Sequence, residues 1–206
     1  MTEIASPFAT QRQRGRPREF DVDAAVDKAI SVFAERGFHA ASVGDLTEAM
    51  ELTQGSLYKA FKDKKDIYIA AIERYKLVQT KRFEAKVQAG KSGREKLMAA
   101  MAFYADNSAG SSGEQGCLIV GAAADLASLD EDVARVVRSA IQAREKILAR
   151  LVREGQADGS VRNVGDADVL AKTALCLLYG MRVVGKTGPS REDMSSVVDA
   201  AMRIFD

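Results

Sequence analysis

Apolar residues recur at intervals of three and four along nearly the whole chain, which places them on one face of an α-helix. Residues that are good N-caps precede several of these runs, and glycines follow or interrupt them. The sequence shows neither the strict alternation of a half-buried strand nor a tandem repeat. The pattern therefore predicts an all-α protein.

In the N-terminal third, short apolar stripes are separated by residues that start or end helices. Gly37 is placed to end the first helix, and Ser42 stands three residues before Asp45, which is the spacing of a capping box. Leu57 and Phe61 follow at i and i+4, so we expect both to face the core. Helices are predicted after four N-cap residues, Asp21, Ser42, Thr53 and Asp63.

The rest of the chain predicts longer helices, the first of which follows Asp63. NSAGSSGEQG (residues 107–116) is rich in glycine and serine and predicts a flexible loop. It leads into the apolar segment CLIVGAAADLA. Further helices are expected over about residues 92–107, 130–154, 166–186 and 190–205.

Three short helices joined by tight turns, the third beginning at Thr53, are typical of a helix-turn-helix unit. The recognition helix of such a unit enters the major groove with its N-terminal residues near the base edges. With Leu57 on the buried side, Gly55, Tyr58 and Lys59 lie on the other side of this helix. Because Gly55 weakens a helix, its presence favours close approach of the backbone to a base.

Charge is unevenly placed along the chain, although its 30 Lys and Arg nearly balance its 29 Asp and Glu. Residues 11–18 hold four arginines and no acid, and residues 52–65 hold four lysines and one acid. A charge run is usually a solvated face, but two basic clusters that flank one small apolar unit are less usual. Lys64 and Lys65 also begin a helix, where cations are unfavourable unless anions such as phosphates lie nearby.

Composition excludes several classes of protein. An apolar run long enough to span a membrane and the apolar core of a signal peptide are both absent, so we expect a cytoplasmic protein with no membrane partner. Two cysteines and one histidine, His39, predict neither a disulfide framework nor a metal site, and no cofactor is expected. Neither a nucleophile–base pair nor a phosphate-binding loop is evident, so the chain is not expected to be an enzyme.

The segment GFHAASVGDLTEAMELTQGSLYKAFKDKKDIY resembles the DNA-binding signature of the tetracycline-repressor (TetR) family of transcriptional regulators. The resemblance implies an all-α fold in which an N-terminal helix-turn-helix precedes a larger helical domain for ligand binding and dimerisation. The family commonly has glycine in the turn where this chain has Glu51, and a non-glycine residue at positive φ there costs about 1 kcal/mol. The matching residues are Gly37, Ser42, Leu46, Ala49, Leu52, Gly55, Leu57, Tyr58, Phe61 and Lys64.

The resemblance also implies roles for individual residues. It implies a homodimer that binds a palindromic double-stranded DNA operator. Phosphate contacts are implied for Ser42, Thr53 and Lys64. Tyr58 has an alternative role, as a ring packed between helices with its hydroxyl in water. Contacts to bases or to the nearby DNA backbone are implied for Gln54, Gly55, Ser56, Tyr58 and Lys59.

The segment before the first helix adds a basic arm to this picture. Arg14, Arg16 and Arg18 surround a Gly-Arg-Pro step that cannot be helical. Such arms lie in the narrow minor groove, where the negative potential favours arginine; the alternative is a basic tail with only non-specific attraction. The expected parts of the chain are a basic flexible arm over residues 1–18, a helix-turn-helix DNA-binding domain over 19–65, and a ligand-binding and dimerisation domain over 66–206.

In the resembled family, the C-terminal domain binds a small molecule and forms a homodimer through its last two long helices. Residues 170–184 and 194–205 agree with this, because they carry wide apolar surfaces that can form a four-helix bundle with a second copy. An ordinary monomer core is the alternative. We therefore expect a repressor released by a small apolar or electrophilic effector, because a non-sensing architectural DNA-binding protein would not need about 140 residues of apolar helical domain.

Cys117 is the candidate trigger within that domain. It follows the glycine-rich loop and begins a helix, which favours a reactive thiolate. GCLIVGAAAD also resembles a motif in a branch of the family, some of whose members sense electrophiles or oxidants through cysteine. The alternative is a cysteine that packs as a small hydrophobic residue. Met101, Tyr104 and Tyr179 are candidates to line the effector pocket, with core packing as their alternative role.

Overall fold

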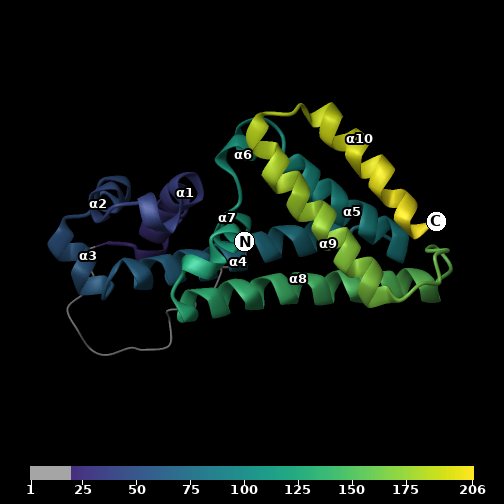
Figure 1. Cartoon of the computed structure of the whole chain (residues 1–206), viewed down its shortest axis with the longest axis horizontal. Helices are drawn as coiled ribbons and strands as arrows, with labels where there is room; N and C mark the ends of the chain where they lie inside the picture. The colour runs from purple at the N-terminus through teal and green to yellow at the C-terminus, as the bar shows by residue number, and fades with distance from the viewer. Residues whose placement is uncertain (1–19) are drawn as a thin grey trace. The chain divides into compact units, whose positions relative to one another are not determined.

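The computed structural model describes residues 20–206, and over these residues the chain is helical with no strand, as predicted (Figure 1). The chain divides into two compact units, Met1–Tyr75 and Lys76–Asp206. Short 3-10 turns follow α7, α9 and α10, at Leu126–Ser128, Gly185–Thr187 and Met202–Phe205. The α-helices are α1 (Val22–Ala40), α2 (Val43–Met50), α3 (Gln54–Ala60), α4 (Lys64–Val87), α5 (Gly93–Asp106), α6 (Gly110–Gln115), α7 (Leu118–Ala124), α8 (Glu131–Ala157), α9 (Ala167–Val184) and α10 (Arg191–Ala201).

The predicted N-caps begin the helices of the first unit. Oδ1 of Asp21 accepts hydrogen bonds from the backbone N–H groups of Asp23 (2.9 Å) and Ala24 (3.2 Å) at the start of α1. At the start of α4, Oδ1 of Asp63 accepts from the N–H of Asp66 at 2.8 Å. These carboxylates satisfy N–H groups that have no partner inside their helices.

The first unit packs its short helices around one apolar core. Gly37 interrupts α1 with a φ of 74° and a ψ of 175°, a conformation that favours glycine. The rings of Phe33 and Tyr68 lie 4.6 Å apart between their centroids, which brings α1 and α4 together. Leu57 and Phe61 face inward, as predicted. The largest buried side chains of this core are Phe33, Leu46, Leu57, Phe61, Ile67, Tyr68 and Ile72.

This unit extends further along α4 than residue 65, where the sequence places the boundary. Ile67 and Tyr68 are buried in its core. Beyond them, the guanidinium of Arg74 binds the carboxylate of Asp27 through Nε (2.9 Å) and Nη2 (2.8 Å), and that of Asp23 through Nη1 (3.0 Å). These bonds tie the first half of α4 to α1, and the unit ends at Tyr75.

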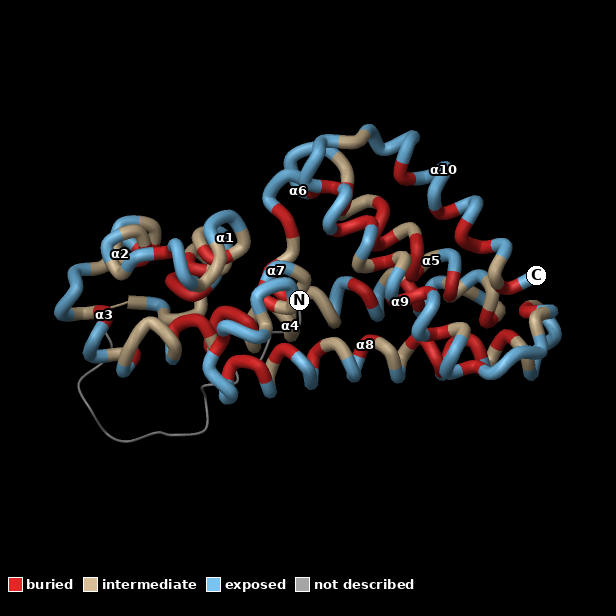
Figure 2. Tube along the Cα trace, in the orientation of Figure 1, coloured by how far each residue is buried: buried red, intermediate tan, exposed pale blue. Residues whose placement is uncertain are grey.

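In the second unit α5 is the central helix, because it packs against α8, α9 and α10 (Figure 1). Gly93 allows the closest approach: a Cβ at this residue would lie 2.1 Å from the backbone nitrogen of Gly155 in α8, so no side chain fits. Buried residues line the inward faces of these helices, and exposed residues line the outward faces (Figure 2). The large buried side chains of α5 are Leu97, Met101, Phe103 and Tyr104.

The prediction of a flexible loop over residues 107–116 is wrong for most of its length, because α6 forms a helix there. A Cβ at Gly113 would lie 2.5 Å from the carbonyl oxygen of Ser108 and 2.7 Å from that of Gly185. The Ser108 hydroxyl is buried and donates to the carbonyl of Tyr104 at 2.7 Å. Close backbone contacts, one local with Ser108 and one with Gly185, which is distant in sequence, therefore order this glycine-rich stretch.

The apolar surfaces predicted on α9 and α10 serve mostly as the core of the chain itself. Leu178 and Met181 on α9, and Val198 and Phe205 near the C-terminus, are buried against the rest of the second unit. A smaller set of apolar side chains stays exposed on these two helices. It consists of Val169, Val183 and Val184 on α9 and Val197 on α10.

Candidate nucleic-acid interface

The turn between α2 and α3 holds Glu51 in the left-handed region, with a φ of 56° and a ψ of 39°. Positive φ at a non-glycine residue is therefore confirmed at the position where the resembled family has glycine. The Glu51 carboxylate pairs with Nζ of Lys28 in α1 at 2.7 Å, and the hydrogen bond from Lys28 lowers the pKa of Glu51. An ion pair to α1 thus accompanies the strained backbone of the turn.

The start of α3 is organised by two hydroxyls. Oγ1 of Thr53, the N-cap, accepts from the backbone N–H of Ser56 at 3.2 Å and donates to Oγ of Ser56 at 3.0 Å. Thr53 is exposed and Ser56 is half-buried. These bonds hold the first turn of α3 in a defined shape, which a helix needs if its N-terminal side chains are to read base edges.

The outer face of α3 carries the predicted base-contacting side chains. Leu57 is fully buried, whereas Gln54, Gly55 and Lys59 are exposed. Tyr58 is 47% exposed, so much of its ring is open to a partner. A Cβ at Gly55 would meet no atom within 4 Å, so packing inside the described chain does not require glycine there. Because packing does not explain the glycine at residue 55, its presence favours the interpretation that DNA approaches the backbone of α3 closely at this residue.

Ser42 begins α2 in the predicted capping box. Its Oγ accepts from the N–H of Asp45 at 3.0 Å, and Oδ2 of Asp45 accepts from the Ser42 N–H at 2.8 Å. Hydrogen bonds from the backbone and hydroxyl of Ser42 lower the pKa of Asp45, and Arg36, bound to Oδ1 at 2.7 Å, adds to this effect. Ser42 itself is exposed, at the helix end that attracts phosphate.

Lys64 has partners inside the chain. Its Nζ donates to the carbonyl oxygens of Phe38 at 2.8 Å and Ala41 at 3.0 Å, and it lies 4.5 Å from the centroid of the Phe38 ring. These carbonyls end α1, and the negative end of a helix dipole compensates a cation. The lysine at the start of α4 therefore has a source of negative charge other than phosphate, and its phosphate contact stays a prediction.

The basic arm cannot be compared with its prediction. Arg14, Arg16 and Arg18, expected in the minor groove, lie outside the described residues. The first described residue, Phe20, directly precedes the N-cap of α1, so the arm is joined in sequence to the helix-turn-helix.

In the second unit, three of the predicted effector-site residues come together. The rings of Tyr104 on α5 and Tyr179 on α9 have centroids 6.2 Å apart. Burial is the main cause that raises the pKa of Tyr179, and a negative charge on Tyr104 or Cys117, when either is ionised, would act in the same direction. Cys117 is the half-buried N-cap of α7, as predicted. Met101 lies in the same hydrophobic core and is 1% exposed, which fits core packing.

Two further residues at this place were missed by sequence reasoning, namely Arg144 on α8 and Arg182 on α9. Only 8% of Arg144 and 5% of Arg182 is exposed. Burial raises the pKa of Tyr104 to about 12, and the positive charges of Arg144 and Arg182 act in the opposite direction. An arginine within an amphipathic helix normally marks the solvent face, so no signal in the sequence indicated this burial.

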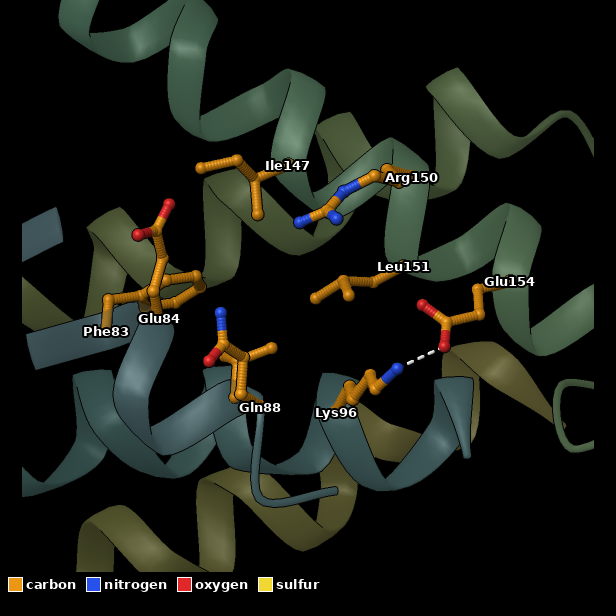
Figure 3. A pocket seen from close by; sticks show the side chains of 9 residues that line it. Phe83, Glu84, Gln88, Lys96, Ile147, Arg150, Leu151 and Glu154 are labelled. Atoms are coloured by element: carbon orange, nitrogen blue, oxygen red, sulfur yellow. Dashed lines mark hydrogen bonds and ion pairs between the residues drawn. The ribbon is translucent and has the colours of Figure 1, made fainter. Parts of the chain in front are cut away.

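A cavity of about 210 Å³ opens between α4, α5 and α8 (Figure 3). Phe83 and Leu151 form its apolar wall, and the ion pair between Lys96 and Glu154 lies at one end. The predicted pocket residues do not line it. Its volume is below the usual range for ligand pockets, about 300–1,000 Å³.

Two absences concern the described residues. Between residues 20 and 206, no helix is both long enough and apolar enough to cross a membrane. In the same stretch, no group of three or more His, Cys, Asp or Glu side chains is arranged to hold a metal ion.

A helix-turn-helix unit with an exposed recognition helix, followed by a separate helical unit, defines the class of DNA-binding transcriptional regulators. Residues 25–71 match the family model described as "Bacterial regulatory proteins, tetR family", and residues 93–200 match the one described as "Tetracyclin repressor-like, C-terminal domain". The chain therefore belongs to the TetR family of transcriptional regulators.

Individual relatives agree with this assignment. The chain is 30% identical over 205 residues to the HTH-type transcriptional repressor ComR of Escherichia coli K12, covering 97% of this chain and 96% of ComR. A cysteine-substituted variant of the TetR-family regulator CifR, solved with a 26-base-pair operator, is 29% identical with a TM-score of 0.81, over 93% of this chain and 100% of that one. The reduced form of Escherichia coli NemR shares the fold at 19% identity, with a TM-score of 0.77 over 89% of this chain and 96% of NemR.

Proposed function

We propose that the chain is a homodimeric repressor that binds a palindromic operator through α3 and is released by a small-molecule effector bound in its second unit. The observation that carries the DNA-binding role is the outer face of α3, where Gln54, Gly55, Tyr58 and Lys59 are exposed around a buried Leu57. The operator complex of CifR, which aligns over most of this chain, supports the same role.

Footprinting on the DNA that flanks the chain's own gene tests this function. The expected result is protection of a palindromic segment, because a two-fold symmetric protein reads two equivalent half-sites. Protection should weaken steeply with salt, since phosphate contacts release counterions. Equal affinity for flanking and random DNA at every salt concentration would contradict a sequence-specific regulator.

The exposed apolar residues of α9 and α10 support the homodimer. Val169, Val183 and Val184 are 64%, 58% and 51% exposed, and Cys176 and Gly180 are also exposed between them. The step of seven residues from Val169 to Cys176, then of four to Gly180 and of three or four to the two valines, places them along one side of α9. Contact with the same stripe of a second copy, together with Val197 of α10, would remove this apolar surface from water.

Gln54 and Lys64 form a contrasting pair of substitutions. Gln54→Ala should relax preference at one base position, costing about 1–3 kcal/mol on the operator and little on random DNA. Lys64→Ala should weaken binding to both DNAs alike and also lower the stability of the first unit, because Nζ binds two carbonyls that end α1. Fluorescence anisotropy with operator and shuffled duplexes measures both. Equal losses on the two DNAs for Gln54→Ala would exclude its base-reading role.

Deleting residues 1–18 should weaken operator binding and reduce its salt dependence, because four arginines per chain leave the complex. The thermal stability should stay unchanged if the arm contributes no core. Affinity measured at several salt concentrations, beside the melting temperature, checks both expectations. If operator affinity is unchanged at low and high salt, the arm is only a tail.

Cys117 is the candidate residue through which an effector would release the operator. If its thiol is the trigger, an electrophile such as N-ethylmaleimide should release operator DNA, and Cys117→Ser should abolish this response while keeping operator affinity. Cys176→Ser removes the other cysteine and serves as the comparison variant; because Cys176 lies in the proposed dimer stripe of α9, the dimeric state of this variant is checked before its response is compared. A normal response in Cys117→Ser would mean that the thiol packs and a reversible ligand is the effector. If no small molecule or thiol reagent in a broad screen releases the DNA, an architectural role replaces the ligand-responsive one.

A further inference from the structure

Arg144 and Arg182 are buried cations without buried counter-charges. The buried polar or charged side chains among residues 20–206 are Ser108, Arg144 and Arg182, so no buried carboxylate in that part of the chain balances the two guanidiniums. Within the same residues, Nη1 of Arg144 and Nη1 of Arg182 are inaccessible to water and have no hydrogen-bond partner. Each arginine thus keeps donor capacity for an acceptor from outside this part of the chain.

The partners that the two arginines do have leave their charge uncompensated. The guanidinium carbon of Arg144 lies 3.7 Å from the centroid of the Phe83 ring, a cation–π contact that offsets part of the burial cost. Nη2 of Arg182 donates to the carbonyl of Gly116 and, at 3.4 Å, to that of Ser112. Neutral partners of this kind do not replace an anion, because an unpaired buried charge is strongly unfavourable.

The two guanidiniums face a common aromatic site. The guanidinium carbon of Arg144 lies 6.0 Å from the centroid of the Tyr104 ring, which packs beside that of Tyr179. Arg182 lies one turn after Tyr179 on α9, so it shares a side of that helix with this ring. Phe83, whose ring makes the cation–π contact with Arg144, also lines the cavity between α4, α5 and α8 (Figure 3). Arg144 lies one turn before Ile147, another residue that lines this cavity, although Arg144 itself is not part of the lining.

We propose that Arg144 and Arg182 bind the carboxylate of a small organic acid whose apolar body packs against Phe83, Tyr104 and Tyr179. The proposal rests on the effector-binding role of the second unit and names the chemical class of the effector. A guanidinium recognises a carboxylate through a planar, charge-assisted hydrogen bond, which matches the free Nη1 groups. A phosphate dianion fits less well, because its higher charge is costlier to bring into an aromatic core.

Arg182 also contacts the segment that precedes α7. Arg182 holds the carbonyl of Gly116, which directly precedes Cys117. A carboxylate that recruits Arg182 would change the hydrogen bonding of this segment, and with it the junction between α6 and α7. In this proposal, the side chain of Arg182 couples the carboxylate of the effector to the position of Cys117.

The test measures the melting temperature of the full-length chain with small carboxylates and with neutral amides of the same shape. Benzoate is compared with benzamide, and butyrate is compared with butyramide. Inorganic phosphate is the third kind of probe. The expected result is a higher melting temperature with carboxylates than with amides or phosphate, since a ligand that binds only the folded state stabilises it. Carboxylates should also release operator DNA. Equal shifts for the carboxylates and their amides, or a shift by phosphate alone, would overturn the proposal.

Substitutions then locate the site. Arg144→Met and Arg182→Met should weaken carboxylate binding on the order of 10-fold to 100-fold and should not lower the melting temperature without ligand, because a buried unpaired charge is removed. The matched control is Arg135→Met, which replaces an exposed arginine of α8 that does not line the cavity; this variant should bind as the wild type does.

Two outcomes separate this inference from the proposed function. Arg144→Lys and Arg182→Lys keep the charge and should retain a weakened preference for carboxylate over amide, even if the methionine variants fail to fold. Loss of stability without loss of this preference would make the arginines structural and overturn the inference. If carboxylates have no effect but the operator is bound and another molecule releases it, the inference fails and the proposed function stands.

Discussion

Replacing Val183 and Val184 together with glutamate should yield a folded monomer that binds a palindromic operator on the order of 10²–10⁴-fold more weakly than the parent chain. Both side chains are more than half exposed on α9, so the substitutions remove nothing from the core of the chain. In the proposed dimer they would bury four like charges in an apolar interface, which is strongly unfavourable. A monomer then engages only one half-site at a time.

Size-exclusion chromatography with light scattering gives the oligomeric state, circular dichroism the fold, and anisotropy the operator affinity. Val164→Glu is the matched control, because Val164 is 94% exposed and lies in the connection between α8 and α9, outside the helix that carries the stripe. It should leave mass and affinity unchanged. A Val183→Glu, Val184→Glu variant that remains dimeric with full operator affinity would show that this face of α9 is not the interface.

Replacing Gly55 with leucine should weaken operator binding by about 1–3 kcal/mol or more, with no loss of folding stability. The stability expectation follows from the open space around Gly55, where a Cβ meets no atom within 4 Å, and from the higher helix propensity of leucine. The loss of DNA binding follows if the backbone of α3 approaches the operator closely, because the new side chain would then hold α3 away from the base edges.

Gly121→Leu is the matched control for Gly55→Leu. Gly121 is an exposed helical glycine in α7 of the second unit, and a Cβ there also meets no atom within 4 Å. Denaturant unfolding and anisotropy on the operator separate stability from binding. Wild-type operator affinity for Gly55→Leu would mean that the start of α3 does not approach DNA closely, and a clear loss of stability would mean that the fold itself requires this glycine.

Local chemistry explains why much of the DNA-binding unit follows from the sequence. The N-caps Asp21, Ser42, Thr53 and Asp63 act within three residues of themselves, so their effect depends on nearest neighbours and not on the fold. The positive φ of Glu51 is likewise local, because the turn between two short helices requires it. The exposed outer face of α3 follows from the same helical geometry once Leu57 is buried.

Long-range contacts explain what the sequence did not show. Lys64 seemed to need an external anion, but the carbonyls that end α1 supply negative charge from more than twenty positions earlier in the chain. The glycine-rich segment around Gly113 is helical where its backbone packs against that of Gly185, about seventy positions later in the chain. Most apolar positions of α9 and α10 face the chain's own core, which leaves only a narrow stripe for a second copy.

The sequence by itself determined the helical class, the helix starts and the orientation of the recognition helix, because these depend on periodicity and on caps that act over a few residues. Tertiary structure alone decided where Lys64 finds its partners and which valines stay exposed. It also decided that Arg144 and Arg182 are buried. Helical periodicity tells which residues share a side of a helix, but only the packing of distant segments determines which side is covered and what lies against each charge.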